Sequence, residues 1–192
     1  MCSQRLLIYG VLFISLFLCA PPLLQVSHGD NSPQATQEQL KAVYLYNFLQ
    51  FVIWPDDHSQ ADQASTKVIG IIGDSTISKP LEELSASLAK KNKHTLQIKN
   101  FGKYEEGIDL SACHLLFVSA SEKHNAEKII ASLKHAPVLT VGDTDIFLSV
   151  GGMITLHEEQ NRVRFHINRK EATAAGLRLS SQLLKTAIDV TE

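Results

Sequence analysis

Short apolar segments alternate with amphipathic ones through the middle of this chain, and this alternation restricts the fold more than any other feature. Three of the segments are apolar runs with the length of buried strands. We expect strands over Lys67–Asp74, Thr95–Phe101, Cys113–Ser119 and Pro137–Val141, with helices over Ile77–Lys91 and Glu122–His135 and a helical turn over Asp143–Leu148. This order predicts an α/β fold with a largely parallel central sheet.

The C-terminal part has a different pattern. Gly151–His157 and Arg162–Asn168 are two expected strands, and EEQN between them predicts a hairpin with a four-residue loop. Helices are expected over Arg169–Gly176 and Leu179–Ala187. Residues 39–190 are therefore predicted to form a single α/β domain, whose largely parallel central sheet is flanked by helices and carries a C-terminal β-hairpin.

The first 29 residues have the pattern of a secretory signal peptide. The apolar run Leu6–Leu18 has 13 residues and would span roughly 20 Å as a helix, less than the roughly 30 Å of a bilayer core. Ser27-His28-Gly29 offers a small-x-small cleavage site before Asp30. Two alternatives stay open, an uncleaved anchor and a lipoprotein, although Leu18 before Cys19 argues against the second. Residues 30–38 are expected to form a flexible polar lead-in.

An aromatic-rich helix is expected to open the domain, in the segment LKAVYLYNFLQFVIWP. Tyr44, Phe48 and Phe51 follow helical spacing, and a helix that is apolar over so much of its circumference is buried on several sides. Pro55 is expected to end it. Most of the aromatic residues are expected in the core. The two expected to stay exposed, which could supply a partner-binding or dimer surface, are Tyr46 and Trp54.

The charge and the cysteines narrow the class of protein. The formal net charge is −2, without the basic patch of a nucleic-acid-binding protein. Two of the three cysteines lie in the signal segment, so only Cys113 remains after cleavage. One thiol cannot form an internal disulfide, and stability must come from packing. We expect Cys113 to be a small buried hydrophobe at a strand start, with an intermolecular disulfide as the alternative.

One face of the strand RVRFHIN carries the candidate binding residues. Because side chains alternate along a strand, Arg162, Arg164 and His166 share a face, opposite to Val163 and Phe165. With an even hairpin loop, Met153, Thr155 and His157 join that face. Arginine binds carboxylate or phosphate in a planar fork, so we expect a small-molecule or partner-carboxylate site there. The alternative is a solvated face whose charges are neutralised by Glu158, Glu159 or Glu171.

Catalytic and metal-binding patterns are missing from the sequence. It contains no GxSxG, no Walker loop, no HExxH and no CxxC. Cys113 and His114 are neighbours on a strand and point to opposite faces, which argues against a thiolate pair. His157 and His166 could meet across the hairpin, but two ligands do not close a metal site. Asp74 follows a buried strand, yet no acidic cluster for Mg²⁺ surrounds it. We expect neither an enzyme nor a cofactor.

Five motifs occur in an order that resembles the YfiR-like family of periplasmic proteins. After the opening segment KAVYLYNFLQFVIWP they are CHLLFVSASE, VLTVGD, GGMITL, NRVRFHIN and AAGLRLSSQLLKTA. The resemblance covers roughly Gln39–Ile188. It implies that the chain is secreted to the periplasm of a Gram-negative cell, and that Arg164 and His166 lie in a ligand-contacting strand. Lone Cys113 departs from members that carry a disulfide, so redox control by an internal disulfide is not expected.

The resemblance also implies a function. The best-known members bind the periplasmic domain of an inner-membrane diguanylate cyclase and repress it, which lowers cyclic di-GMP and disfavours biofilm formation. An outer-membrane lipoprotein can sequester such a repressor, and members can form homodimers. Our first hypothesis is therefore a repressor that acts by protein–protein contact. Our second is a periplasmic module that binds a small ligand at the Arg164 and His166 face for another membrane sensor.

Overall fold

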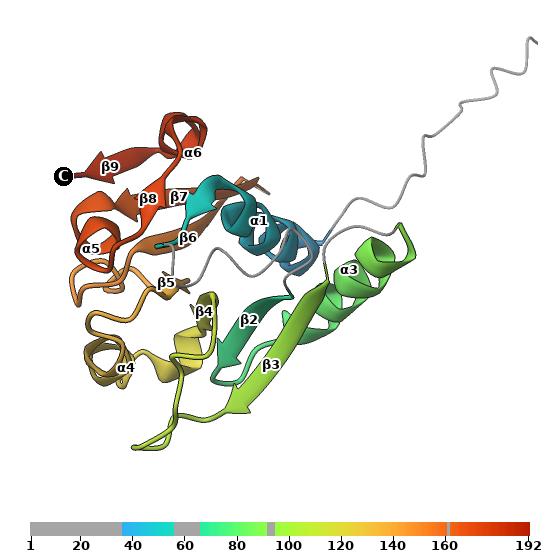
Figure 1. Cartoon of the computed structure of the whole chain (residues 1–192), viewed down its shortest axis with the longest axis horizontal. Helices are drawn as coiled ribbons and strands as arrows, with labels where there is room; N and C mark the ends of the chain where they lie inside the picture. Colours follow the sequence, from blue (N-terminus) through green and yellow to red (C-terminus); the bar gives the residue numbers. More distant parts are fainter. Residues whose placement is uncertain (1–35, 56–65, 92–94, 161) are drawn as a thin grey trace, which may run out of the picture. The chain divides into compact units, whose positions relative to one another are not determined.

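The computed structural model describes residues 36–55, 66–91, 95–160 and 162–192 (Figure 1). The expected signal peptide and most of the lead-in lie outside these residues. All described residues belong to one unit, Ala35–Glu192. Among them, no helix combines the length and the apolar character needed to cross a bilayer.

A seven-stranded sheet with the order β3-β2-β4-β5-β6-β7-β9 forms the centre of this unit (Figure 1). All neighbouring strands are parallel except β6 and β7, which form the hairpin. The predicted α/β fold with a largely parallel sheet is confirmed. The strands are β2 (Lys67–Ile72), β3 (Leu96–Gly102), β4 (Leu115–Val118), β5 (Leu139–Gly142), β6 (Ile154–Glu159), β7 (Arg162–Asn168) and β9 (Asp189–Thr191).

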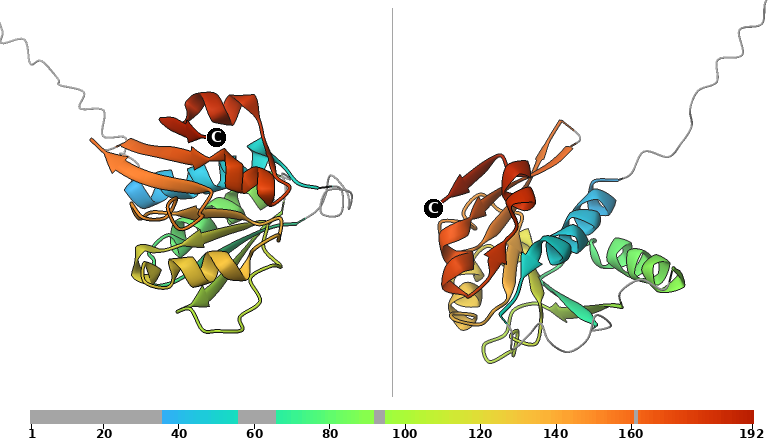
Figure 2. Two further views of the ribbon diagram at one scale, coloured as in Figure 1. Left: turned by 90° about the vertical axis from the view of Figure 1, so that its left-hand side faces the viewer. Right: turned by 45° about the horizontal axis from the view of Figure 1, so that its top comes forward.

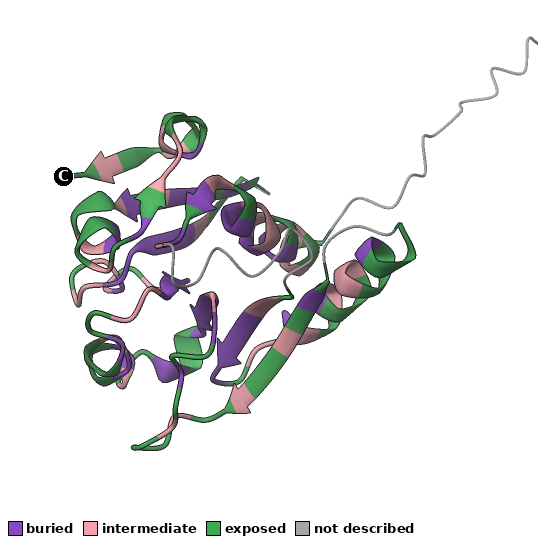
Figure 3. Ribbon diagram, viewed as in Figure 1, coloured by how far each residue is buried: buried purple, intermediate pink, exposed green. Residues whose placement is uncertain are grey.

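Helices cover both faces of this sheet, which is why its central strands are apolar throughout. The helices are α1 (Gln37–Phe51), α3 (Ser78–Lys90), α4 (Ala126–Ser132), α5 (Arg169–Ala174) and α6 (Ser181–Thr186). Side chains of α1 and α3 pack with Ile69 and Phe117 in one core, and those of α4 pack with Leu116 and Val118 in a second. The alternation of these residues along β4 places the two cores on opposite faces. Figures 2 and 3 show α1 beside α3 and the buried central strands.

The opening helix begins earlier and ends earlier than the sequence predicts. Thr36 caps α1 through a reciprocal capping box with Gln39, so the ordered chain starts inside the expected lead-in. The helix stops at Phe51, before the expected end at Pro55, because the next two residues form the strand β1 (Val52–Ile53). This strand pairs with β8 (Arg178–Leu179), from the far end of the chain.

The prediction that Trp54 is exposed is wrong. Its side chain is 5% exposed, because the β1–β8 pairing turns the chain inward and seats the indole in the core. The Lys67 Nζ lies 4.8 Å from the centroid of the indole ring, and the His114 ring packs at 5.9 Å. Trp54 cannot therefore serve as a partner or dimer surface. Tyr46 is partly exposed and packs against the same core.

Smaller differences occur around α4 and the last strands. The expected helix over Glu122–His135 is divided into a 3-10 turn, η1 (Ala120–Glu122), and the shorter α4. Ile129 and Leu133 are buried as predicted, whereas Ile130 is partly exposed. Residues 145–150 form turns, in the segment where a helical turn over Asp143–Leu148 was expected. The sequence did not predict β1, β8 or β9, which are only two or three residues long.

Cys113 is buried among apolar groups, as the first of the two alternatives predicts. It is 4% exposed, and burial raises the pKa of its thiol to about 11. Gly70 of β2 lies against it, so that a Cβ added at Gly70 would come within 2.6 Å of the Cys113 Sγ.

Candidate functional site

The β6–β7 hairpin places the predicted polar residues on one face. The cross-strand partners are Thr155 with His166, His157 with Arg164, and Glu159 with Arg162. Two residues, 160 and 161, separate the strands, in place of the expected four-residue loop. Both lengths are even, so the predicted common face of the hairpin is unchanged.

The two arginines differ in their surroundings. The Arg164 Nε lies 3.5 Å from the Glu159 Oε2, and both side chains are about half exposed. Such an exposed pair contributes little to stability, so its arginine can exchange partners at low cost. Arg162 is exposed, and no carboxylate of the described residues lies within 4 Å of it. Of the three neutralising residues proposed from sequence, only Glu159 pairs with an arginine of this face.

The two histidines meet, as the sequence suggested. The rings of His157 and His166 lie 4.7 Å apart at 73°, an edge-to-face arrangement. The His157 Nδ1 is 3.7 Å from the exposed carboxylate of Asp145. Within the described residues, no three histidine, cysteine or acidic side chains are grouped so that they could hold a metal ion. The two histidines therefore offer polar groups on the same face of the hairpin as the arginines.

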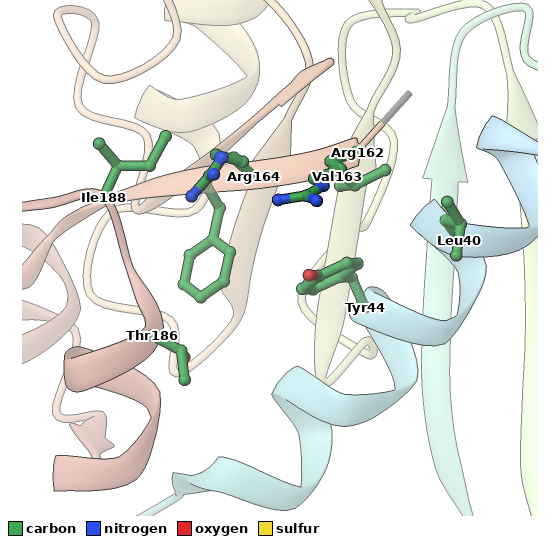
Figure 4. Close-up of a pocket in the computed structure, with 8 residues that line it drawn as sticks. Leu40, Tyr44, Arg162, Val163, Arg164, Thr186 and Ile188 are labelled. Carbon is green, nitrogen blue, oxygen red and sulfur yellow. The ribbon is translucent and has the colours of Figure 1, made fainter. Parts of the chain in front are cut away.

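A groove of about 300 Å³ runs along the edge of β7, and we call it the β7 groove (Figure 4). One wall is α1, the other is the segment that joins α6 to β9, and β7 lies between them. Tyr44 packs edge-on against Phe165, with ring centroids 5.8 Å apart, and forms part of the apolar lining. The lining residues are Leu40, Tyr44, Arg162, Val163, Arg164, Phe165, Thr186 and Ile188.

The structure thus brings only part of the predicted site together. Arg162 and Arg164 lie at the β7 groove, whereas His157 and His166 share their face of the hairpin but do not line it. Leu40 and Ile188 complete the apolar lining, and neither was among the site residues predicted from the sequence. Ile188 is 48% exposed, and it lies beside β7 because the following strand, β9, pairs with β7.

A buried lysine on α1 holds a cluster of charges that the sequence analysis also missed. Lys41 is 7% exposed, and its Nζ lies 2.7 Å from Glu158, 3.4 Å from Asp143 and 3.4 Å from Glu38. Burial alone lowers the pKa of its ammonium. The hydrogen bond to Glu158 and the charges of Asp143 and Glu38 outweigh burial, so that the pKa is raised. The sequence held one signal of this burial. Lys41 stands four residues before the buried Leu45, and this spacing places both side chains on the same face of a helix.

A second hollow, of about 620 Å³, lies at the carboxyl ends of the parallel strands. It is lined by residues that follow β2, β4 and β5, namely Asp74, Ser119 and Asp143. β3 and β4 flank β2 on opposite sides, so the chain changes direction across the sheet at this point. Ligands of open α/β sheets bind at such switch points. The sequence identified only Asp74 here.

Of two similar solved structures, the first supports the fold. A conserved domain protein of Vibrio cholerae superposes with a TM-score of 0.52 at 12% identity, over 82% of this chain and 61% of its own. An ABC domain of Streptococcus pneumoniae in complex with L-Trp gives a TM-score of 0.48 at 16% identity, over 65% of this chain and 55% of its own. The chain thus spans less than two thirds of the length of either structure. No curated protein matches.

The sequence profile of the YfiR/HmsC-like family matches residues 38–188. This range begins in α1 and ends just before β9, so it includes nearly every described element. The resemblance drawn from the sequence motifs is confirmed. The chain belongs to the YfiR/HmsC-like family, a family of periplasmic regulators of cyclic di-GMP signalling.

Proposed function

We propose that this protein represses a membrane diguanylate cyclase by binding the part of the enzyme that lies outside the cytoplasm. Membership of the YfiR/HmsC-like family over residues 38–188 carries this proposal. The β7 groove supports it, because an apolar lining beside two exposed arginines is the composition of a protein-binding surface.

Repression follows if the regulator binds the inactive conformation of the cyclase more tightly than the active one. Binding then shifts the enzyme toward the inactive state by as much as the two affinities differ. Release of the regulator raises cyclic di-GMP and favours biofilm formation. An outer-membrane lipoprotein that sequesters the regulator, and a homodimer, belong to the same proposal. The protein performs no catalysis in this scheme and needs no cofactor.

The test is the cellular concentration of cyclic di-GMP in a strain that lacks the gene. Deletion should raise the concentration, and the wild-type gene should restore it. The variant Arg162→Glu/Arg164→Glu should fail to restore it if the β7 groove binds the partner. The control Lys123→Glu/Lys128→Glu makes the same change of charge at two exposed positions beside and within α4, and should behave as wild type. No change on deletion, while the wild-type protein is expressed, would refute repression.

The second candidate is a module that binds a small ligand for another membrane sensor. The hollow at the switch point of the sheet favours this function, because it is formed by strand ends, where α/β domains bind small molecules. Thermal unfolding in the presence of a panel of amino acids and small organic anions tests it. A saturable rise in melting temperature, lost in Ser119→Ala, together with unchanged cyclic di-GMP on deletion, would favour the sensor over the repressor.

A further inference from the structure

Half of β7 has an edge that no strand of the described residues covers. β9 pairs only with His166, Ile167 and Asn168, and the first four residues of β7 extend beyond it. At the point where β9 begins, the Ile188 N–H donates to the Phe165 carbonyl. Backbone groups of alternate residues point to the same edge of a strand, so the N–H and C=O of Val163 also point away from β6. This free edge is the template that a further strand would use.

The β7 groove lies along this free edge and gives the two faces of an added strand different surroundings. On one side lies the apolar lining, which is formed by Leu40 and Tyr44 of α1 and by Ile188 of the segment that joins α6 to β9. By the alternation along β7, Arg162 and Arg164 belong to the other, exposed face of the strand, and both side chains border the groove (Figure 4). Side chains of an added strand would alternate between these two surroundings.

The charges select one kind of occupant. Arg162 has no acidic partner within 4 Å among the described residues, and Arg164 has only the exposed Glu159. Charged residues on an edge strand discourage indiscriminate pairing, but they attract a strand of opposite charge. A small anion could satisfy the arginines. It would leave the backbone groups of Val163 and the length of the groove unused.

We propose that the free half of β7 accepts an extended acidic segment of the partner as an additional strand, in line with β9. Acidic residues of that segment lie beside Arg162 and Arg164, and the apolar residues between them face α1. Backbone hydrogen bonds supply affinity and the alternating side chains supply specificity. This inference rests on the proposed function for the identity of the partner, and adds how the partner is recognised.

The first test is binding of a fluorescein-labelled peptide of alternating aspartate and valine, DVDVDVD, measured by fluorescence anisotropy. The wild type and the Lys123→Glu/Lys128→Glu control should bind it. Arg162→Glu/Arg164→Glu should bind it about tenfold or more weakly, since two exposed ion pairs are lost and replaced by repulsion. The peptide KVKVKVK should show the opposite preference. Equal binding of DVDVDVD to all three proteins would overturn the proposal.

The second test separates strand addition from simple attraction of charges. N-methylation of the aspartate amides in one DVDVDVD peptide, and of the valine amides in another, removes the N–H donors along one edge at a time. One edge faces β7 and the other faces solvent, so one methylated peptide should lose binding and the other should retain it. If both retain binding, or both lose it, the partner is not recognised as a strand.

The two proposals can fail separately. If DVDVDVD binds as a strand but Arg162→Glu/Arg164→Glu still restores cyclic di-GMP to the wild-type level, strand addition stands and the groove does not mediate repression. If the variant fails to restore it while methylation of either edge has no effect, repression through this surface stands. In that case the strand mechanism is refuted.

Discussion

The buried lysine of α1 offers the sharpest test of what holds this fold together. Lys41→Met keeps the length of the side chain and removes its charge. Breaking a fully buried ion pair costs about 3–5 kcal/mol, because the partner is left charged and without a counterion. Here Glu158 and Glu38 are 41% and 31% exposed and can regain water, whereas Asp143 is only 18% exposed. We therefore expect Lys41→Met to lower the free energy of unfolding by about 2–3 kcal/mol, mostly because Asp143 is left without a counterion.

The assay is thermal and urea unfolding of the wild type, Lys41→Met and the control Lys128→Met, which removes an exposed lysine of α4. A loss of about 2–3 kcal/mol lowers the melting temperature by about 4–12 °C in a domain of this size. Lys41→Met/Asp143→Asn should recover part of the loss, because it removes the stranded carboxylate. A Lys41→Met protein as stable as the control, or no recovery in the double variant, would show that the charge of Lys41 does not stabilise the fold.

The pH dependence of stability gives an independent check on the same cluster. The folded state raises the pKa of Lys41 above its value in the unfolded chain. Its contribution is therefore fully present below the unfolded pKa of about 10.4 and is lost as the pH rises through the higher folded value. Between pH 9 and pH 11.5, the wild type should lose more stability in urea than Lys41→Met does. Parallel pH profiles would show that the ammonium contributes nothing.

Two further predictions concern the second core. Native Cys113 should resist iodoacetamide at pH 8, because with a thiol pKa of about 11 only on the order of a thousandth of it is thiolate. Unfolding in urea should make it react. Rapid labelling of the native protein would contradict the burial of Cys113. Gly70→Ala should destabilise the domain by about 1–3 kcal/mol, because the new Cβ would come within 2.6 Å of the Cys113 Sγ and 2.9 Å of the Phe101 ring. In urea unfolding, the double variant Gly70→Ala/Cys113→Ala should recover part of the lost stability. An unchanged unfolding midpoint for Gly70→Ala alone would mean that β2 can move to make room for the new Cβ.

Residues close together in the sequence accounted for the strands and for the candidate face. The period of two in RVRFHIN placed Arg162 and Arg164 on one side of β7 and Val163 and Phe165 on the other, and the structure agrees. An even hairpin loop sufficed to bring His157 to the same face, whatever its length. These predictions hold because the alternation of side chains along a strand is a property of the backbone itself.

The contacts of Trp54 and Ile188 could not be predicted in this way. Trp54 was expected to be exposed, but pairing of β1 with β8 buries it. β8 and β9 have two and three residues, too few for a periodic pattern to be recognised. Their positions, and with them the wall of the β7 groove at Ile188, depend on the chain's return to the sheet after α5 and α6.

The α/β class, the family and the faces of individual strands could be read from the amino-acid sequence, because each follows from local periodicity or from motifs in order. Which surfaces are open and which charges are buried depends instead on the tertiary structure. Lys41 and Asp143 are 102 positions apart, and β9 covers the second half of β7 but not the first. These contacts depend on which distant segments pack together. Burial across the whole domain determines that packing, and no local sequence pattern predicts it.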